Sequence, residues 1–134
     1  MSLLLLDTTF LIDAERGAAD VDELIGDDDD VAIAAITVAE LTVGVQLATS
    51  RQRPRRQSYV DEIIASIPIL PYDESVALHH ASLLVNVRRT GRPRGAHDLI
   101  IAATAAAAGR TVVSADRRAF DGLPGVIAID HRSA

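Results

Sequence analysis

Short apolar runs alternate along the chain with longer segments whose apolar residues recur at helical spacing. A short apolar run bounded by turn residues is typical of a buried strand, and an apolar residue every three or four positions is typical of a helix. The pattern predicts five strands, over residues 3–6, 31–34, 68–70, 111–114 and 126–129. Strands that alternate with helices indicate an α/β domain with a parallel sheet and right-handed crossovers.

Helices are predicted between these strands, and capping residues mark several of their starts. Asp20, Thr37 and Asp73 each precede a stretch with apolar residues on one face, and Pro54 is acceptable in a first helical turn. A glycine at position 109 fits the end of the last long helix. The predicted helices cover about residues 9–15, 20–25, 37–48, 54–67, 73–87 and 96–108, and a short helical turn covers 117–121.

Length and composition favour one cytoplasmic domain. A chain of 134 residues suits a single domain, which we expect to span residues 1–134. It has no cysteine, which excludes disulfides and zinc–thiolate sites and fits a reducing compartment. No apolar run approaches the roughly 18 residues that span a membrane, and the opening leucines are too few for a signal core. We therefore expect a soluble, cytoplasmic protein with no membrane partner.

The net charge of −6 taken alone argues against binding to nucleic acid. All 13 basic residues are arginines, however, and most of them cluster. Arginine forms bidentate contacts with phosphate, so the clusters are candidate contacts for RNA, although arginine-only usage can equally reflect genome composition. The clusters are Arg51, Arg53, Arg55 and Arg56; Arg88, Arg89, Arg92 and Arg94; and Arg117 and Arg118.

Four acids fall where a parallel sheet opens its ligand crevice, at the carboxyl ends of its strands. Asp7 ends the first predicted strand, and Asp116 lies just past the fourth. Glu40 and Asp98 lie near the starts of two predicted helices. Four carboxylates packed together would repel one another strongly, and a divalent cation between them would relieve this repulsion. Oxygen ligands without cysteine favour Mg²⁺, with Mn²⁺ as a possible substitute, over zinc.

Each acid also has a purely structural interpretation. Asp7 can cap the helix that follows it, and Asp116 can cap the next helical turn. Glu40 with Thr37 matches a capping box, which is the favoured interpretation on local grounds alone. Asp98 can interact with the helix dipole, worth about 0.3–1 kcal/mol. The shared position of the four acids, rather than any one of them, therefore predicts the metal site.

Four segments resemble, in order and spacing along nearly the whole chain, the motifs of the PIN-domain ribonucleases. Each motif alone is weak, but the combination is specific. The size and the single domain resemble the VapC-type toxins of type II toxin–antitoxin systems. The segments are Leu4 to Asp13 (LLLDTTFLID), Thr37 to Leu41 (TVAEL) with Gly44, His97 to Ala105 (HDLIIAATA), and Val113 to Asp116 (VSAD) with Phe120.

The resemblance implies a five-stranded parallel sheet in the order 3-2-1-4-5. It also implies a metal-dependent endoribonuclease, usually a homodimer, that is held inactive by a cognate antitoxin. Thr8 and Ser114 match supporting hydroxyl positions near the metal. Arg117 and Arg118 stand where many relatives have another acid or an amide. This departure argues against complete binding of a second metal ion. The acidic quartet of the family falls on Asp7, Glu40, Asp98 and Asp116.

The expected reaction is hydrolysis of an RNA phosphodiester by a metal-activated water, which leaves a 5′-phosphate and a 3′-hydroxyl. The arginine clusters would hold the RNA backbone with salt-sensitive affinity, and an unpaired RNA loop would supply specificity. Two alternatives keep the same fold: a catalytically silent binding module and a housekeeping RNA-processing nuclease. A phosphotransfer enzyme or receiver domain is disfavoured, because the chain has no lysine and no phosphate-cradling glycine loop.

The remaining polar residues receive structural interpretations. The acidic run at residues 27–30 is expected to be a solvated loop, and Asp13 is expected to lie off the pocket face. None of the four histidines has the spacing of a paired metal ligand. His80 falls on an apolar stripe, which predicts a core or dimer-interface residue, and His97 borders the site only because it precedes Asp98.

Overall fold

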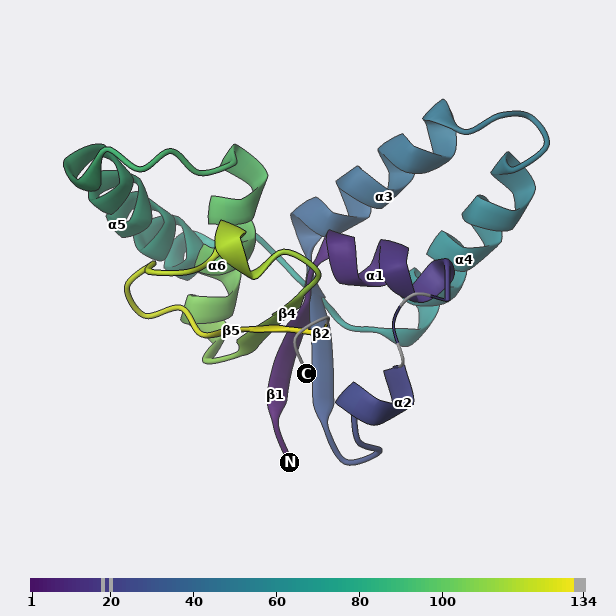
Figure 1. Cartoon of the computed structure of the whole chain (residues 1–134), viewed down its shortest axis with the longest axis horizontal. Helices are drawn as coiled ribbons and strands as arrows, with labels where there is room; N and C mark the ends of the chain where they lie inside the picture. Colours follow the sequence, from purple (N-terminus) through teal and green to yellow (C-terminus); the bar gives the residue numbers. More distant parts are fainter. Residues whose placement is uncertain (18, 20, 132–134) are drawn as a thin grey trace.

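A five-stranded parallel sheet forms the centre of the protein, whose computed structural model describes residues 1–17, 19 and 21–131 (Figure 1). The strand order is β3-β2-β1-β4-β5, with every neighbouring pair parallel. The predicted fold class and strand order are thus confirmed. The strands are β1 (Leu3–Leu6), β2 (Asp30–Ala34), β3 (Ile69–Leu70), β4 (Thr111–Ser114) and β5 (Ala128–Asp130).

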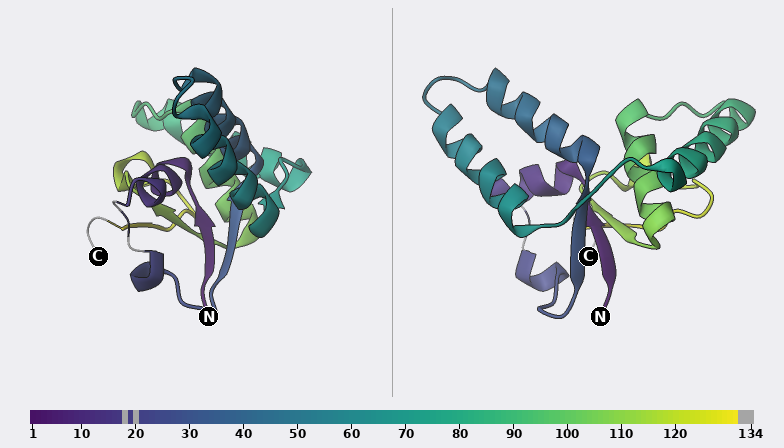
Figure 2. Two further views of the ribbon diagram at one scale, coloured as in Figure 1. Left: turned by 90° about the vertical axis from the view of Figure 1, so that its right-hand side faces the viewer. Right: turned by 180° about the vertical axis from the view of Figure 1, so that it is seen from behind.

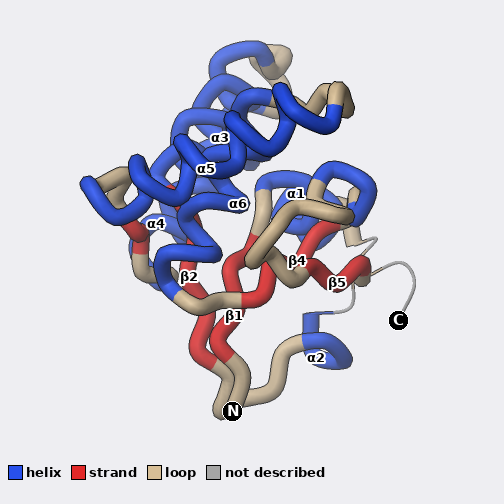
Figure 3. Tube along the Cα trace, turned by 90° about the vertical axis from the view of Figure 1, so that its left-hand side faces the viewer, coloured by secondary structure: helices blue, strands red, loops and turns tan. Residues whose placement is uncertain are grey.

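Helices form two pairs that project from opposite sides of the sheet, as Figures 1 and 2 show. One pair consists of α3 and α4, and the other of α5 and α6, while α1 lies across the end of β1 (Figure 3). None of the helices in the described part of the chain is both long and apolar enough to cross a bilayer. The helices are α1 (Thr8–Glu15), α2 (Val21–Leu24), α3 (Ala35–Leu47), α4 (Arg53–Ser66), α5 (Glu74–Thr90), α6 (Ala96–Ala108) and a 3-10 turn, η1 (Arg117–Ala119).

The leucine run of β1 explains how both faces of the sheet are filled. Successive residues of a strand point to opposite faces. Leu5 packs in the cluster that includes Leu83 of α5 and Ile101 of α6. Leu4 and Leu6 pack in the second cluster, with residues of α1, α3 and α4. A central parallel strand covered on both faces needs apolar residues at consecutive positions, and the sequence supplies them.

Several element boundaries differ from the predicted ones. The helix predicted to start at Thr37 begins at Ala35, and Thr37 is fully buried, so the prediction that Thr37 caps it was wrong. The helix predicted to end near residue 87 continues to Thr90, where Gly91 ends it with a φ of 65°. The last strand begins two residues later than predicted. The predicted cap at Asp20 lies outside the described residues.

Two leucines of α5 allow a matched test of this packing. Leu83 is 3% exposed within the first cluster, whereas Leu78 is 65% exposed. We expect Leu83→Ala to lower the free energy of unfolding by about 2–5 kcal/mol, because it removes apolar packing and leaves a cavity. Leu78→Ala should change it by less than about 0.5 kcal/mol. Urea denaturation measures both, and equal decreases would contradict this assignment of the core.

Candidate active site

Asp7 is a buried carboxylate at the point where β1 ends and α1 begins. Its side chain is 2% exposed and is surrounded by donors. Oδ1 accepts hydrogen bonds from the Phe10 amide at 2.9 Å and from the Thr9 hydroxyl at 2.8 Å, and Oδ2 accepts one from the Ser114 hydroxyl at 2.7 Å. The bond from Phe10 is an N-cap, so the structural interpretation of Asp7 is confirmed. Capping occupies only part of its hydrogen-bonding capacity, and the other donors fix the carboxylate in place.

The carboxylate of Asp7 has a pKa that is raised from its ordinary value. Burial raises the pKa above the usual value for aspartate, and the charge of Glu40 adds to this rise. The three hydrogen bonds lower the pKa but do not cancel the effect of burial. A negative charge that donors only partly compensate favours a positive group nearby.

Hydroxyl groups connect Asp7 to the end of β4. The Thr9 hydroxyl accepts from the Ala115 amide at 3.0 Å, and the Ser114 hydroxyl accepts from the Asp116 amide at 2.8 Å. Each hydroxyl therefore donates to Asp7 and accepts from the backbone that directly follows β4. Ser114 thus holds Asp7 in place, while its role near a metal stays a prediction. Thr9 was missed by the sequence analysis, although a second hydroxyl directly after Asp7-Thr8 was a signal for it.

Glu40 comes from the second turn of α3 and reaches toward α1 and α6. Its Oε1 accepts from the Thr8 hydroxyl at 2.6 Å, while the role of Thr8 near a metal stays a prediction. Its Oε2 lies 3.3 Å from Nδ1 of His97. The capping-box interpretation of Glu40 was wrong, because α3 starts at Ala35 and places Glu40 too far along the helix to reach its end. His97 is more than a sequence neighbour of the site, since it contacts one of the four acids.

Asp98, on the first turn of α6, shows that the four acids share one neighbourhood. Burial is the largest cause that raises the pKa of Asp98, and the charges of the other three acids raise it further. His97 acts in the opposite direction. The four carboxylates follow β1, lie on α3 and α6 and follow β4, and the other three are near enough to Asp98 to repel its charge.

Asp116 is exposed and occupies the N-cap position of η1, but its side chain makes no capping hydrogen bond there. The interpretation of Asp116 as a helix cap was therefore wrong. Asp98 and Asp116 both lack a side-chain hydrogen bond within the described residues, in contrast to Asp7 and Glu40. Two of the acids are thus fixed by donors and two are free to turn.

A hard divalent cation fits this donor set by its chemistry. The four carboxylates offer only oxygen ligands, and their mutual repulsion is what a cation relieves. Across the described residues, no three Asp, Glu or His side chains already stand in a geometry that could hold a metal ion. Closing on one ion therefore requires side-chain rotation, for which Asp98 and Asp116 have the freedom.

Gly95 controls the space around Asp98. It is the N-cap residue of α6, with a φ of −61° that any residue can adopt. A Cβ atom at Gly95 would lie only 2.7 Å from Oδ2 of Asp98. The absence of a side chain there lets Asp98 take its present position. Sequence analysis missed Gly95, because a glycine next to a helix start is first interpreted as a turn residue.

The arginines predicted to bind RNA divide into two groups. Four of them bind other parts of the protein. Arg53 donates to the carbonyl oxygen of Ala48 at 3.0 Å, and Arg56 donates to that of Gly44 at 3.4 Å. Arg94 donates to the carbonyl oxygens of Arg118 and Asp121. Arg117 pairs with the Asp121 carboxylate at 3.3 Å. The others are exposed, namely Arg51, Arg55, Arg88, Arg89, Arg92 and Arg118.

The remaining polar residues lie apart from the four acids. Asp13 is buried against His131, with 2.9 Å between Oδ2 and Nε2, which confirms that it does not face the site. His80 is half-buried and bonds to the Tyr72 hydroxyl at 2.8 Å, so the prediction of a core histidine was wrong, while an interface role stays a prediction. In the acidic run at 27–30, the Asp29 carboxylate accepts hydrogen bonds from two backbone amides, as a loop residue does. Asp30 instead begins β2 and pairs with Arg110 at 2.7 Å, so the prediction of a solvated loop was wrong for Asp30.

Comparisons with known proteins give one family. The family model for the PIN domain matches residues 4–125. The chain is 34% identical over 123 residues to Ribonuclease VapC5 of Mycobacterium tuberculosis, with 90% of each protein covered. It is 31% identical over 94 residues to the tRNA(fMet)-specific endonuclease VapC of Salmonella typhimurium, with 70% of each covered. A solved structure of VapBC-5, a toxin–antitoxin system from M. tuberculosis, matches with a TM-score of 0.81 at 33% identity over 97% of this chain and 99% of that one.

Substitution of Gly95 tests the position of Asp98 without removing an acid. We expect Gly95→Ala to keep the melting temperature close to wild type, because its backbone suits alanine and only the carboxylate has to move. Its affinity for Mn²⁺, measured by calorimetric titration, should fall by about 10–100-fold. Gly44→Ala is the control, since nothing lies within 4 Å of its added Cβ. Unchanged affinity in Gly95→Ala would contradict the placement of Asp98 at the ion.

The burial of Asp98, together with the charges of the other three acids, has a consequence for stability. The raised pKa means that the folded protein binds a proton at Asp98 more tightly than the unfolded chain does. The folded state therefore loses stability as the pH rises from the usual aspartate pKa through the raised one. In EDTA at pH 7 we expect Asp98→Asn to raise the melting temperature, and this gain should vanish below about pH 4, where both states are protonated.

Asp27→Asn, in an exposed loop, removes the same formal charge and is the matched control for Asp98→Asn. It should leave the melting temperature near that of the wild type at pH 7. A melting temperature for Asp98→Asn at or below the wild-type value at pH 7 would contradict the electrostatic coupling of the four acids.

Proposed function

Since the chain belongs to the PIN domain family, we propose that it is a metal-dependent endoribonuclease and the toxin of a toxin–antitoxin pair. Two relatives carry the names ribonuclease and endonuclease, and a similar structure is that of a toxin–antitoxin system. The observation that carries the proposal is the shared electrostatic neighbourhood of four carboxylates from distant parts of the chain. A binding module without catalysis would have no need to gather four mutually repelling acids.

The metal of the proposed site is Mg²⁺, with Mn²⁺ as a substitute. Asp7, Glu40, Asp98 and Asp116 would hold it, because carboxylate oxygens are the ligands that these hard cations prefer. When bound, the cation supplies charge stabilisation at the phosphate and lowers the pKa of a bound water.

The chain's own residues have separate tasks in this reaction. Three donors hold Asp7 and the Thr8 hydroxyl holds Glu40, so these two carboxylates are positioned before the substrate arrives. Asp98 has no competing hydrogen bond within the described residues. It can therefore accept a hydrogen bond from the attacking water and orient this water. Attack at phosphorus breaks the bond to the 3′-oxygen and leaves a 5′-phosphate and a 3′-hydroxyl.

The proposal also covers the partners and setting of the enzyme. Its substrate is RNA, its inhibitor a cognate antitoxin protein, and its assembly a homodimer. We place the reaction in the cytoplasm, where RNA and antitoxin meet, and we assign the whole of residues 1–134 to one domain. The similarity to VapBC-5 supports the antitoxin in particular, because that structure is described as a toxin–antitoxin system.

Cleavage of RNA by the purified chain tests the proposal. We expect mixed RNA to be cut in the presence of Mg²⁺ and to stay intact in EDTA. Asp7→Asn should lower the rate by about 100-fold or more, equivalent to about 2.7 kcal/mol or more of transition-state stabilisation. Asp61→Asn, an exposed residue of α4, is the control and should keep the wild-type rate. Gel electrophoresis of end-labelled RNA measures both rates.

Other outcomes would favour the alternatives. Wild-type protein with no EDTA-sensitive cleavage would reject the enzyme in favour of a silent module. Full activity in Asp7→Asn would reject the assigned acids. Expression of the wild-type chain should arrest growth and expression of Asp7→Asn should not; normal growth with an active enzyme would indicate a housekeeping nuclease instead of a toxin.

A further inference from the structure

An open hollow lies beside two of the four acids. Its walls are the segment that joins α5 to α6 and the turn η1. Asp98 and Asp116 line it together with three arginines, Arg92, Arg94 and Arg118. Carboxylates and guanidinium groups thus share one small surface, with the acids on the side of the proposed metal. None of these three arginines pairs with either acid within the described residues.

Arg94 builds the hollow, because its guanidinium group is engaged with the backbone of the protein itself. Its guanidinium group donates to the carbonyl oxygen of Arg118 at 3.1 Å and also to that of Asp121. These bonds tie the segment before α6 to the turn on the opposite wall. Since both acceptors are backbone oxygens, they hold the walls at a fixed separation whatever the nearby side chains do.

Arg92 and Arg118 are the available cations of the hollow. Both are exposed, and within the described residues neither guanidinium group has a hydrogen-bond or ion-pair partner. The end of Arg92 crosses toward the opposite wall, where Nη1 lies 3.5 Å from the point that a Cβ of Gly122 would occupy. Two positive groups without a partner, beside a cluster of acids, suit an anion that spans both charges.

We propose that this hollow binds the RNA phosphate next to the one that is cleaved, with Arg92 and Arg118 as its ligands. The inference rests on the proposed function, because it takes the scissile phosphate to lie at the four acids. Successive phosphates of an RNA strand then need a positive group beyond the metal, and the guanidinium group binds phosphate in a bidentate manner. Asp98 and Asp116 line the hollow, so a phosphate bound in it would be a neighbour of one held at the four acids.

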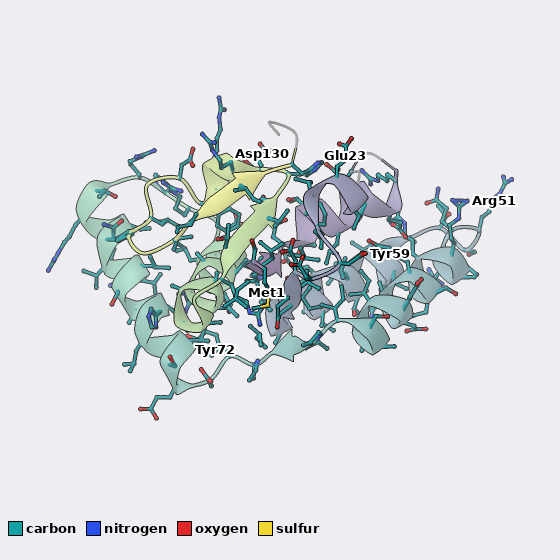
Figure 4. All side chains as sticks on the ribbon, turned by 90° about the horizontal axis from the view of Figure 1, so that it is seen from below. Met1, Glu23, Arg51, Tyr59, Tyr72 and Asp130 are labelled. Carbon is teal, nitrogen blue, oxygen red and sulfur yellow. The ribbon has the colours of Figure 1, made fainter. Side chains whose placement is uncertain are left out.

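The proposal singles out Arg92 and Arg118 from the arginines that the sequence suggested as RNA contacts. Arg53, Arg56 and Arg117 are engaged with the protein itself. Arg51 lies at the far tip of the α3–α4 pair (Figure 4), away from the strand ends that carry the acids. Arg51 with Arg55, which are both exposed, therefore makes a matched control pair for the arginines of the hollow.

The salt dependence of RNA binding tests the inference. Binding of a fluorescently labelled single-stranded RNA would be measured by anisotropy in EDTA, without turnover, at several salt concentrations. On a single strand, each phosphate that the protein neutralises adds about 0.7 to the steepness of log K against log salt. We expect Arg92→Gln/Arg118→Gln to reduce this steepness by about 0.7, because the two arginines share one phosphate, and Arg51→Gln/Arg55→Gln to leave it unchanged. Both pairs remove the same charge from exposed positions, so melting temperatures should stay at the wild-type value.

An equal slope in Arg92→Gln/Arg118→Gln and wild type would overturn the inference, as would an equal reduction in the two double variants. A wild-type chain that binds no RNA at low salt would also overturn it. The failure of the proposed function is a different result: no metal-dependent cleavage by the wild type. If the slope changes as expected in a chain that does not cleave, the phosphate subsite stands and the enzyme does not.

Discussion

A negative charge buried at the carboxyl end of β1 is the constraint on which the rest of the site depends. Asp7 is 2% exposed, and burying a carboxylate is unfavourable unless donors or a cation compensate it. The protein supplies three donors, and two of them, the hydroxyls of Thr9 and Ser114, also accept from the backbone after β4. The donors that stabilise Asp7 thus connect the end of β1 to the end of β4, which places Asp7 beside Asp116.

The sheet and its two apolar layers carry the other acids to the same place. Leucines on both faces of β1 fix this strand at the centre, with β2 and β4 as its neighbours. The helices that follow β2 and precede β4 then begin near the end of β1 and bring Glu40 and Asp98 with them. Donors hold Asp7 and Glu40, whereas Asp98 and Asp116 are free to turn. Such a division suits a site that has to open and close around an ion.

The sequence predicted the strands and the proximity of the four acids, but not their contacts, and the role of the acids at a metal stays a prediction. The apolar run of β1 and the helix at 96–108 stand out because their patterns are local and unbroken. The cap predicted at Thr37 was wrong because a capping-box pattern is local, whereas the burial of Thr37 depends on packing. His97 and Gly95 act on acids through space, and Arg94 reaches two backbone carbonyls whereas Arg92 reaches none within the described residues. No property of the residue types alone separates these roles.

Crystals grown with Mn²⁺ and measured at the manganese absorption edge would test most directly whether the four acids share a cation. We expect an anomalous peak between Asp7, Glu40, Asp98 and Asp116, with carboxylate oxygens at the roughly 2.0–2.6 Å that hard cations keep from oxygen ligands. The side chains of Asp98 and Asp116 should have rotated toward it, while Asp7 keeps its three donors. Crystals with no peak there, or with a peak only at another group such as the loop at 27–30, would contradict the metal site.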